Sequence, residues 1–222
     1  MTEGLLDRIL TGKLRLVSIA PDGTEFATPP DRAVVLAGSF NPLHVGHERL
    51  LAAASALTGR APAYELSVTN VDKPQLSTAD VLLRLSQFRG KGLVVITRAP
   101  TFVEKSELMP GTLFAIGYDT ATRLFTERYY PRYDAKADLS RAGSAVALAF
   151  NTLRRNHCGF VIAGRAGSDG RFRTVADLAA PPEFRDMLTE LPESAFRADI
   201  SSTQLRAARR GLTVPDSTGT MA

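Results

Sequence analysis

Short hydrophobic runs, separated by longer segments with apolar residues at helical spacing, recur along most of the chain. Continuous runs of this length are typical of strands that are buried on both faces of a parallel sheet. Five runs fit this description, at residues 33–37, 64–69, 93–97, 113–116 and 160–163.

Helical patterns lie between most of these runs. Ser77 or Thr78 is placed to cap a helix that runs to about Phe88, Asp119 to open another, and residues 139–153 form an alanine-rich helix. This alternation predicts an α/β fold, with a doubly wound, Rossmann-like parallel sheet of about five strands and helices on both faces. In such folds ligands bind beyond the carboxyl ends of the strands.

The ends of the chain differ from this repeating pattern. Residues 1–30 combine a short amphipathic helix with an alternating segment at 14–19, which indicates an appended element packed on the domain or on a second subunit of a homo-oligomer. Residues 31–212 form the main domain, and residues 213–222 have the composition of a disordered tail. Residues 165–173 are rich in glycine and charge, which favours a loop or hairpin.

Composition narrows the class of protein. The chain has 222 residues, 44% hydrophobic, and no apolar run of the roughly 20 residues that cross a membrane. Its first residues, MTEGLLDRIL, lack the pattern of a signal peptide, so we expect a cytoplasmic protein without a membrane partner. The single cysteine, Cys158, excludes a disulfide framework and a thiolate zinc cluster.

The net charge says less than the composition about the class of protein. The formal net charge is +4, but the arginines are scattered and no aromatic RNA-binding motif is present. We therefore expect no nucleic-acid partner, and the excess of cations favours a small anionic ligand only weakly.

The segment GSFNPLHVGH, from Gly38 to His47, follows the first predicted strand and opens an alanine-rich helix. A glycine-containing turn at a helix start offers backbone N–H groups and the positive end of the helix dipole to an anion. His44 and His47 are three residues apart, so at a helix start both can donate to one phosphate.

Two other interpretations of these histidines stay open. One is a metal site, although His157 and Cys158 are the only other soft ligands in the chain, and we predict no metal ligands. The other is a pair of capping or core histidines with no ligand at all.

A second segment, ISSTQLR, begins at Ile200. Its hydroxyl cluster predicts the start of a short helix with Arg206 about one turn inside. Such a cluster is either an ordinary N-cap or, with the arginine, a site for the β- and γ-phosphates of a nucleotide.

With these two motifs in this order, the chain resembles the HxGH nucleotidylyltransferase superfamily, and is most similar to its nicotinamide or nicotinate mononucleotide adenylyltransferase branch. The resemblance covers residues 31–212 and includes IGYD at 116–119 and VIAGRAG at 161–167. It implies catalytic roles for His44, His47 and Arg206. It also implies that the nucleotide is bound by Gly38, Ser39, Phe40, Asn41, Gly46, Ile200, Ser201, Ser202 and Thr203.

The resemblance further implies residues for the second substrate. Lys73 matches a lysine that meets the acceptor phosphate, Asp119 an aspartate that holds the acceptor nucleotide, and Arg165 an arginine near the phosphates. The alternative interpretation of Lys73 and Arg165 is a surface residue that binds no ligand, and that of Asp119 is a helix cap. The chain departs from the family in having Tyr118 at a usually small position and no tryptophan to stack a pyridine ring; Phe102 is the candidate substitute, or else a core residue.

The expected reaction is transfer of AMP from ATP, with Mg²⁺ carried by the ATP, to a pyridine mononucleotide or another phosphate monoester. Such a reaction depends on positioning and on neutralising charge at the phosphoryl oxygens. The alternatives are adenylyl or cytidylyl transfer to another phosphate monoester, and a noncatalytic nucleotide-binding sensor.

Overall fold

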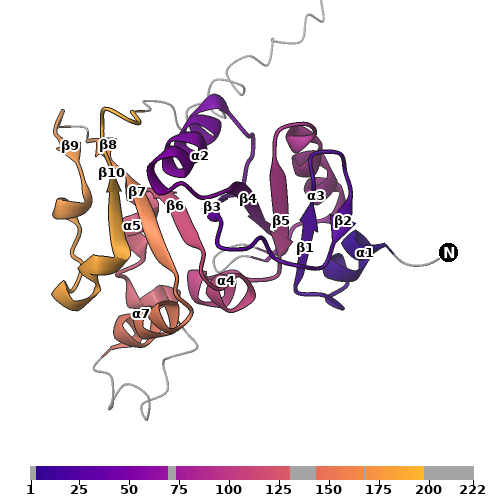
Figure 1. Cartoon of the computed structure of the whole chain (residues 1–222). Helices are drawn as coiled ribbons and strands as arrows, with labels where there is room; N and C mark the ends of the chain where they lie inside the picture. Colours follow the sequence, from indigo (N-terminus) through magenta and orange to yellow (C-terminus); the bar gives the residue numbers. More distant parts are fainter. Residues whose placement is uncertain (1–3, 70–73, 131–143, 168, 198–222) are drawn as a thin grey trace, which may run out of the picture.

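The fold is built around a mostly parallel sheet of eight strands flanked by helices (Figure 1). The computed structural model describes residues 4–69, 74–130, 144–167 and 169–197. The strands of the sheet follow the order β10-β7-β6-β3-β4-β5-β1-β2. Their bounds are β1 Leu16–Ile19, β2 Glu25–Phe26, β3 Val34–Ala37, β4 Pro62–Ser67, β5 Leu93–Thr97, β6 Leu113–Gly117, β7 Gly159–Ala163 and β10 Leu188–Leu191.

Helices fill most of the connections between the strands. None of them, within the described ranges, combines the length and apolar character needed to traverse a lipid bilayer. The α-helices are α1 Leu5–Leu10, α2 Val45–Thr58, α3 Thr78–Leu85, α4 Phe102–Leu108, α5 Tyr118–Arg123 and α7 Ala145–Arg155. Short 3₁₀ helices lie at Ser86–Phe88, Glu127–Tyr129, Val175–Asp177 and Pro182–Met187.

The strand order identifies where a ligand would bind. The strands β10, β7, β6, β3, β4 and β5 are all parallel to one another. Numbered along the chain from β3, they have the spatial order 3-2-1-4-5-6 of the Rossmann fold. The order reverses between β3 and β6, where Leu36 is paired with Ala115, and folds of this kind bind ligands at the carboxyl ends of the two strands that flank such a reversal.

The α/β class is confirmed, but the prediction of about five strands is wrong. Two of the additional strands come from the N-terminal segment, where β1 pairs antiparallel with β5 and β2 with β1. The third, β10, is an edge strand in which Leu188 and Leu191 are buried while Thr189 and Glu190 are exposed. It has no continuous hydrophobic run, so the criterion that found the central strands did not detect it.

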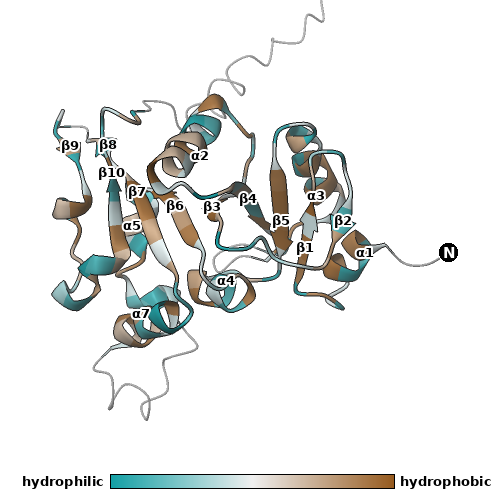
Figure 2. Ribbon diagram, viewed as in Figure 1, coloured by the Kyte–Doolittle hydropathy of each residue, from teal (hydrophilic) through white to brown (hydrophobic). Residues whose placement is uncertain are grey.

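Two hydrophobic clusters cover the two faces of the sheet. One contains buried residues of α4, α5 and α7, and the other contains buried residues of α1, α2 and α3. Figure 1 shows α2 on one side of the sheet and α4 and α7 on the other. The central strands are coloured hydrophobic in Figure 2, whereas α2 and α7 carry hydrophilic turns. Burial on both faces explains why these strands have continuous apolar runs.

One of the predicted helix starts is confirmed, and others are wrong. Ser77 caps α3, because its side chain accepts a hydrogen bond from the Asp80 N–H, as predicted. Asp119 does not open its helix: α5 begins at Tyr118 with Gly117 at the N-cap. The helix predicted at 139–153 begins later than predicted: α7 starts at Ala145, where the side chain of its N-cap Ser144 accepts a hydrogen bond from the Ala147 N–H, and it ends at Arg155. Residues 139–143 lie outside the described residues.

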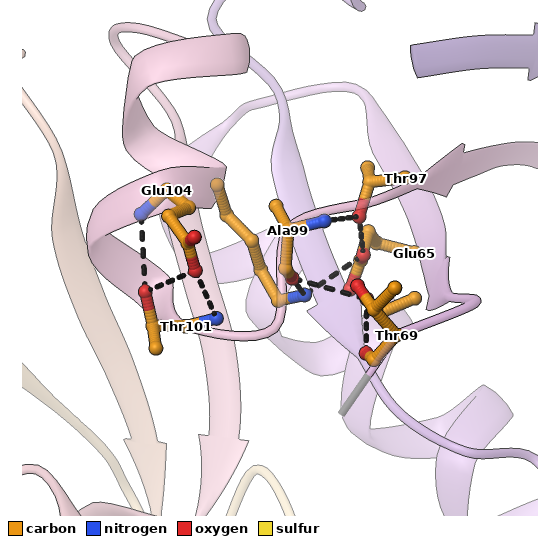
Figure 3. Close-up of polar contacts among 8 residues, drawn as sticks. Glu65, Thr69, Thr97, Ala99, Thr101 and Glu104 are labelled. Atoms are coloured by element: carbon orange, nitrogen blue, oxygen red, sulfur yellow. Dashed lines mark hydrogen bonds and ion pairs between the residues drawn. The ribbon is translucent and has the colours of Figure 1, made fainter. Parts of the chain in front are cut away.

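A buried polar network joins the ends of β4 and β5 to α4 (Figure 3). Lys105 Nζ lies 2.9 Å from Glu65 Oε1 and donates to the carbonyl of Ala99 at 2.5 Å. The Thr97 hydroxyl donates to the same Glu65 oxygen and accepts from the Ala99 N–H. Lys105 is 5% exposed and Glu65 1%, so each charge depends on the other for compensation.

This network predicts that removing one of the two buried charges destabilises the fold more than removing both. Lys105→Met leaves Glu65 buried without its cation and should lower the free energy of unfolding by about 3–5 kcal/mol. Adding Glu65→Gln to that variant should recover part of the loss, because no buried charge then remains. Urea denaturation of the single and double variants measures both effects.

The control is Lys91→Met, which breaks a largely exposed ion pair with Glu48 and should cost less than about 1 kcal/mol. A double variant that is less stable than Lys105→Met would contradict the prediction.

Candidate functional site

The candidate site lies where the chain leaves β3 and β6. The loop that begins at Gly38 follows β3, and Tyr118 and Asp119 follow β6. Because β3 and β6 are parallel neighbours, these segments lie at the same edge of the sheet. The topology therefore brings the first predicted motif and IGYD to the fork where Rossmann-like folds bind ligands.

The phosphate loop, residues 38–44, is anchored by a buried aromatic side chain. Phe40 is 1% exposed and has a φ of 43°, in the left-handed region. Its ring makes edge contacts with the rings of His47, Tyr64 and Phe88, at centroid distances of 5.1, 5.6 and 5.1 Å. Its side chain therefore packs in the core, and only its backbone is left to meet a nucleotide, whereas Ser39 and Asn41 are exposed.

Gly38 is required by a close approach of the chain to itself. A Cβ atom at this position would lie 2.9 Å from Cζ of Phe40. The Phe40 ring cannot move aside easily, because it is enclosed by the aromatic rings around it. The Gly38 N–H donates to the carbonyl of Glu65 at 3.0 Å, which joins the start of the loop to β4.

His44 and His47 meet at the start of α2. His44 is the N-cap, and its ring stacks on that of His47 with a centroid distance of 3.7 Å. The His44 N–H donates to Nδ1 of His47 at 3.3 Å. Since an accepting nitrogen carries no proton, the neutral His47 ring carries its proton on Nε2 and can donate from that atom.

Both imidazoles are held in their neutral form. Burial, followed by the nearby His44, lowers the pKa of His47 to about 4, against a smaller opposing effect of Glu48. Burial also lowers the pKa of His44, again opposed by Glu48. At neutral pH the pair offers hydrogen-bond donors rather than fixed cations. An arriving polyphosphate would raise both pKa values, because an opposite charge favours the protonated form.

Backbone donors complete this part of the site. The dipole of the 14-residue helix α2 places partial positive charge at its start. Within the described residues, the N–H groups of Val45 and Gly46 have no carbonyl of the helix to bond, whereas the N–H of His47 donates to the carbonyl of His44 at 2.9 Å. Gly46 is buried next to the histidines. The arrangement suits an anion with several oxygens.

A pocket of about 430 Å³ lies at the carboxyl ends of β6 and β7, the same edge of the sheet at which the chain leaves β3. Asp119 and Arg165 form an ion pair within it. Arg165 belongs to a hairpin of β8 Arg165–Ala166 and β9 Phe172–Arg173, in which Arg165 and Arg173 are cross-strand partners. The pocket is lined by Tyr118, Asp119, Arg165, Ala166, Gly167 and Arg173.

The structure accounts for the unusual Tyr118. Its side chain is 9% exposed, belongs to a hydrophobic cluster, and donates from its hydroxyl to the carbonyl of Asp177 at 3.3 Å. Arg173 was missed by the sequence analysis, although it ends the glycine- and charge-rich segment that indicated a hairpin. Its place opposite Arg165 depends on strand pairing, which that composition does not specify.

Not every predicted residue reaches the pocket. Phe102 begins α4, half-buried, and its ring packs edge-on against Phe114 and Phe160 at 5.2 and 5.3 Å. It is absent from the lining of the pocket. Six predicted residues lie outside the described residues: Lys73, Ile200, Ser201, Ser202, Thr203 and Arg206.

In the described ranges, no three His, Cys, Asp or Glu side chains gather in a way that could hold a metal ion. The two histidines of the phosphate loop stack on each other and have no third ligand of these types within those ranges.

Comparison with models of known protein families found no match to the chain, and comparison with curated proteins found none. The interpretation of the site therefore depends on the geometry described above and on the sequence motifs.

The contact between Gly38 and Phe40 gives a testable consequence. Gly38→Ala places a methyl group against a ring that is already enclosed, so it should lower the free energy of unfolding by about 1–3 kcal/mol. Gly117→Ala is the control, because a Cβ there has no atom within 4 Å. Chemical denaturation should separate the two variants, and equal stability of Gly38→Ala and wild type would refute the close contact.

The lowered pKa of His47 predicts how stability depends on pH. The unfolded chain has the ordinary histidine pKa near 6.5 and the folded protein about 4, so between these values the unfolded state binds more protons. The free energy of unfolding should therefore fall as pH decreases from about 6.5 to 4. His47→Asn should show a shallower fall over this interval.

Urea unfolding at several pH values tests this difference, because the contributions of carboxylates are common to both proteins. His157→Asn is the control: His157 is exposed at the opposite edge of the sheet, and its φ of 55° suits asparagine. Parallel curves for wild type and His47→Asn would show that His47 does not titrate as described.

Proposed function

We propose that this protein is an ATP-dependent adenylyltransferase that joins AMP to the phosphate of a mononucleotide and releases pyrophosphate. The observation that carries the proposal is the pair of neutral imidazoles, stacked at 3.7 Å, at the start of a long helix at the fork of the sheet. Two donors of this kind beside the N–H groups of Val45 and Gly46 suit the α-phosphate and the departing pyrophosphate of a triphosphate.

The acceptor side is proposed to be the pocket at the carboxyl ends of β6 and β7. Its exposed ion pair, Asp119 and Arg165, offers an acceptor for hydroxyl or amide donors and a donor for a phosphate. The resemblance in sequence favours nicotinate or nicotinamide mononucleotide as the molecule bound there. Lys73 would add a contact to its phosphate.

The proposed reaction is a single in-line displacement. A phosphate oxygen of the acceptor attacks the α-phosphorus of ATP, a new P–O bond forms, and the bond to the bridging oxygen breaks to release pyrophosphate with Mg²⁺. His44 and His47 donate hydrogen bonds to the phosphoryl oxygens as charge builds there, and Arg206 with the hydroxyl cluster at 201–203 holds the β- and γ-phosphates. No covalent intermediate with the protein is required, so the residues act by positioning and neutralisation.

A second candidate acceptor is another phosphate monoester, and the position of Phe102 favours it. The ring that would replace the tryptophan of the family packs against Phe114 and Phe160, so a different mode of recognition would be needed for a pyridine ring. The adenylyl-transfer part of the proposal does not depend on this residue.

The test is release of pyrophosphate from Mg²⁺–ATP in the presence of nicotinate mononucleotide, nicotinamide mononucleotide, phosphopantetheine or no acceptor. Turnover is expected with a pyridine mononucleotide. His47→Asn should lower kcat by about 10²–10³-fold, as is typical when one donor to a transition-state oxygen is lost, whereas His157→Asn should retain the wild-type rate.

Binding of ATP without turnover on any acceptor would instead support the sensor role. An unchanged kcat in His47→Asn, with loss of ATP affinity alone, would show that His47 binds the nucleotide without a catalytic role.

A further inference from the structure

The phosphate loop is held from outside by the helical segment that follows β4. Gln87 lies in the 3₁₀ turn after α3, and its side-chain amide reaches the loop. Nε2 donates to the carbonyl of Phe40 at 3.0 Å, and Oε1 accepts from the N–H of Leu43 at 2.9 Å. One planar amide thereby joins both ends of the turn that contains Asn41 and Pro42.

Arg84 extends this contact by one helical turn. Its guanidinium donates to the carbonyl of Ser39 at 2.8 Å. Gln87 Nε2 also donates to the carbonyl of Arg84 at 3.2 Å, which fixes the amide relative to its own segment. The hydrogen bonds of Gln87 are partly buried and so partly shielded from water, whereas the bond from Arg84 to Ser39 is exposed.

These bonds determine which backbone donors remain for an anion. The N–H of Gly38 is bonded to Glu65, that of Leu43 to Gln87, and that of His44 to His47. Among the described residues, the N–H groups of Val45 and Gly46 at the start of α2 then remain for an anion, beside the two imidazoles. The N–H groups of Ser39 and Phe40 remain in the loop, so its shape determines where these donors point.

We propose that Gln87 is a positioning residue for polyphosphate binding. It fixes the backbone from Phe40 to Leu43, and through it the placement of His44 and His47, before the ligand arrives. Arg84 supports the same loop at Ser39. This inference rests on the proposed function, because the ligand that benefits from the preorganised loop is the triphosphate of ATP.

The substitutions separate the two hydrogen bonds. Gln87→Met has a similar length and removes both bonds, whereas Gln87→Glu keeps an acceptor for the Leu43 N–H and loses the donor to the Phe40 carbonyl. Arg84→Lys retains a donor for Ser39, and Arg84→Met does not. The matched control is Gln75→Met, because Gln75 contacts the carbonyl of Leu10 and the side chain of Arg98 instead.

Calorimetric titration with inorganic tripolyphosphate, Mg²⁺–ATP and adenosine measures the effect. We expect Gln87→Met to weaken binding of tripolyphosphate and ATP by about tenfold or more, with the affinity for adenosine unchanged. Arg84→Met should weaken polyphosphate binding, and Arg84→Lys should recover most of it. Gln75→Met should behave as wild type.

The titration with adenosine distinguishes a positioning role from a general loss of structure. A damaged fold would weaken the binding of all three ligands together. Equal polyphosphate affinity in wild type and Gln87→Met overturns the positioning role but leaves the proposed function intact. Failure of wild type to bind ATP or tripolyphosphate overturns both. If Gln87→Met does not fold, Gln87→Glu and the Arg84 pair decide the question by the same criteria.

Discussion

Burial of the sheet on both faces is the constraint on which the rest of this structure depends. The central strands carry apolar side chains above and below, so a polar side chain within them must be fully compensated where it lies. Glu65 meets this condition through Lys105 and Thr97. Groups that bind a hydrated anion cannot meet it inside the sheet, and they are therefore confined to the strand ends. The reversal of strand order between β3 and β6 then selects one position along that edge.

The phosphate loop at this position is held in one conformation by contacts from both sides. A loop that offers backbone donors must keep its shape without the regular hydrogen bonds of a helix or strand. Here the aromatic ring of Phe40 anchors the loop from within, Gly38 allows that ring to lie against the backbone, and Arg84 and Gln87 bond to its carbonyl and N–H groups from outside. The cost of ordering the loop is thus met during folding, and little of it remains for ligand binding. Under the proposed function the histidines are neutral before a nucleotide binds, so binding of a polyphosphate should be accompanied by uptake of protons.

The sequence indicated those parts of the molecule that depend on local pattern. The hydrophobic runs located β5 at its observed bounds, and the segment from Gly38 to His47 was correctly expected to join a strand to a helix. Elements fixed by tertiary pairing were harder to predict: β10 has only two buried positions, and β1 was recognised as a strand but not as a neighbour of β5. Gln87 had no signal at all, because a glutamine in a helical segment is ordinary until the loop it bonds is placed beside it. Phe102 shows the converse case, in which a plausible residue type packs into the aromatic core.

The antiparallel strand β1 has a consequence for the behaviour of the chain before it is fully folded. In the finished structure β1 covers β5, and the two-residue β2 forms the outermost edge on that side. Without them β5, with its sequence LVVIT, would present a row of unpaired backbone groups next to strongly β-forming side chains, which is the kind of edge that recruits other chains. By covering the edge of β5, the N-terminal segment should lower the tendency of the chain to aggregate. Its contribution would be seen in the yield and solubility of a truncated chain more than in the chemistry of the site.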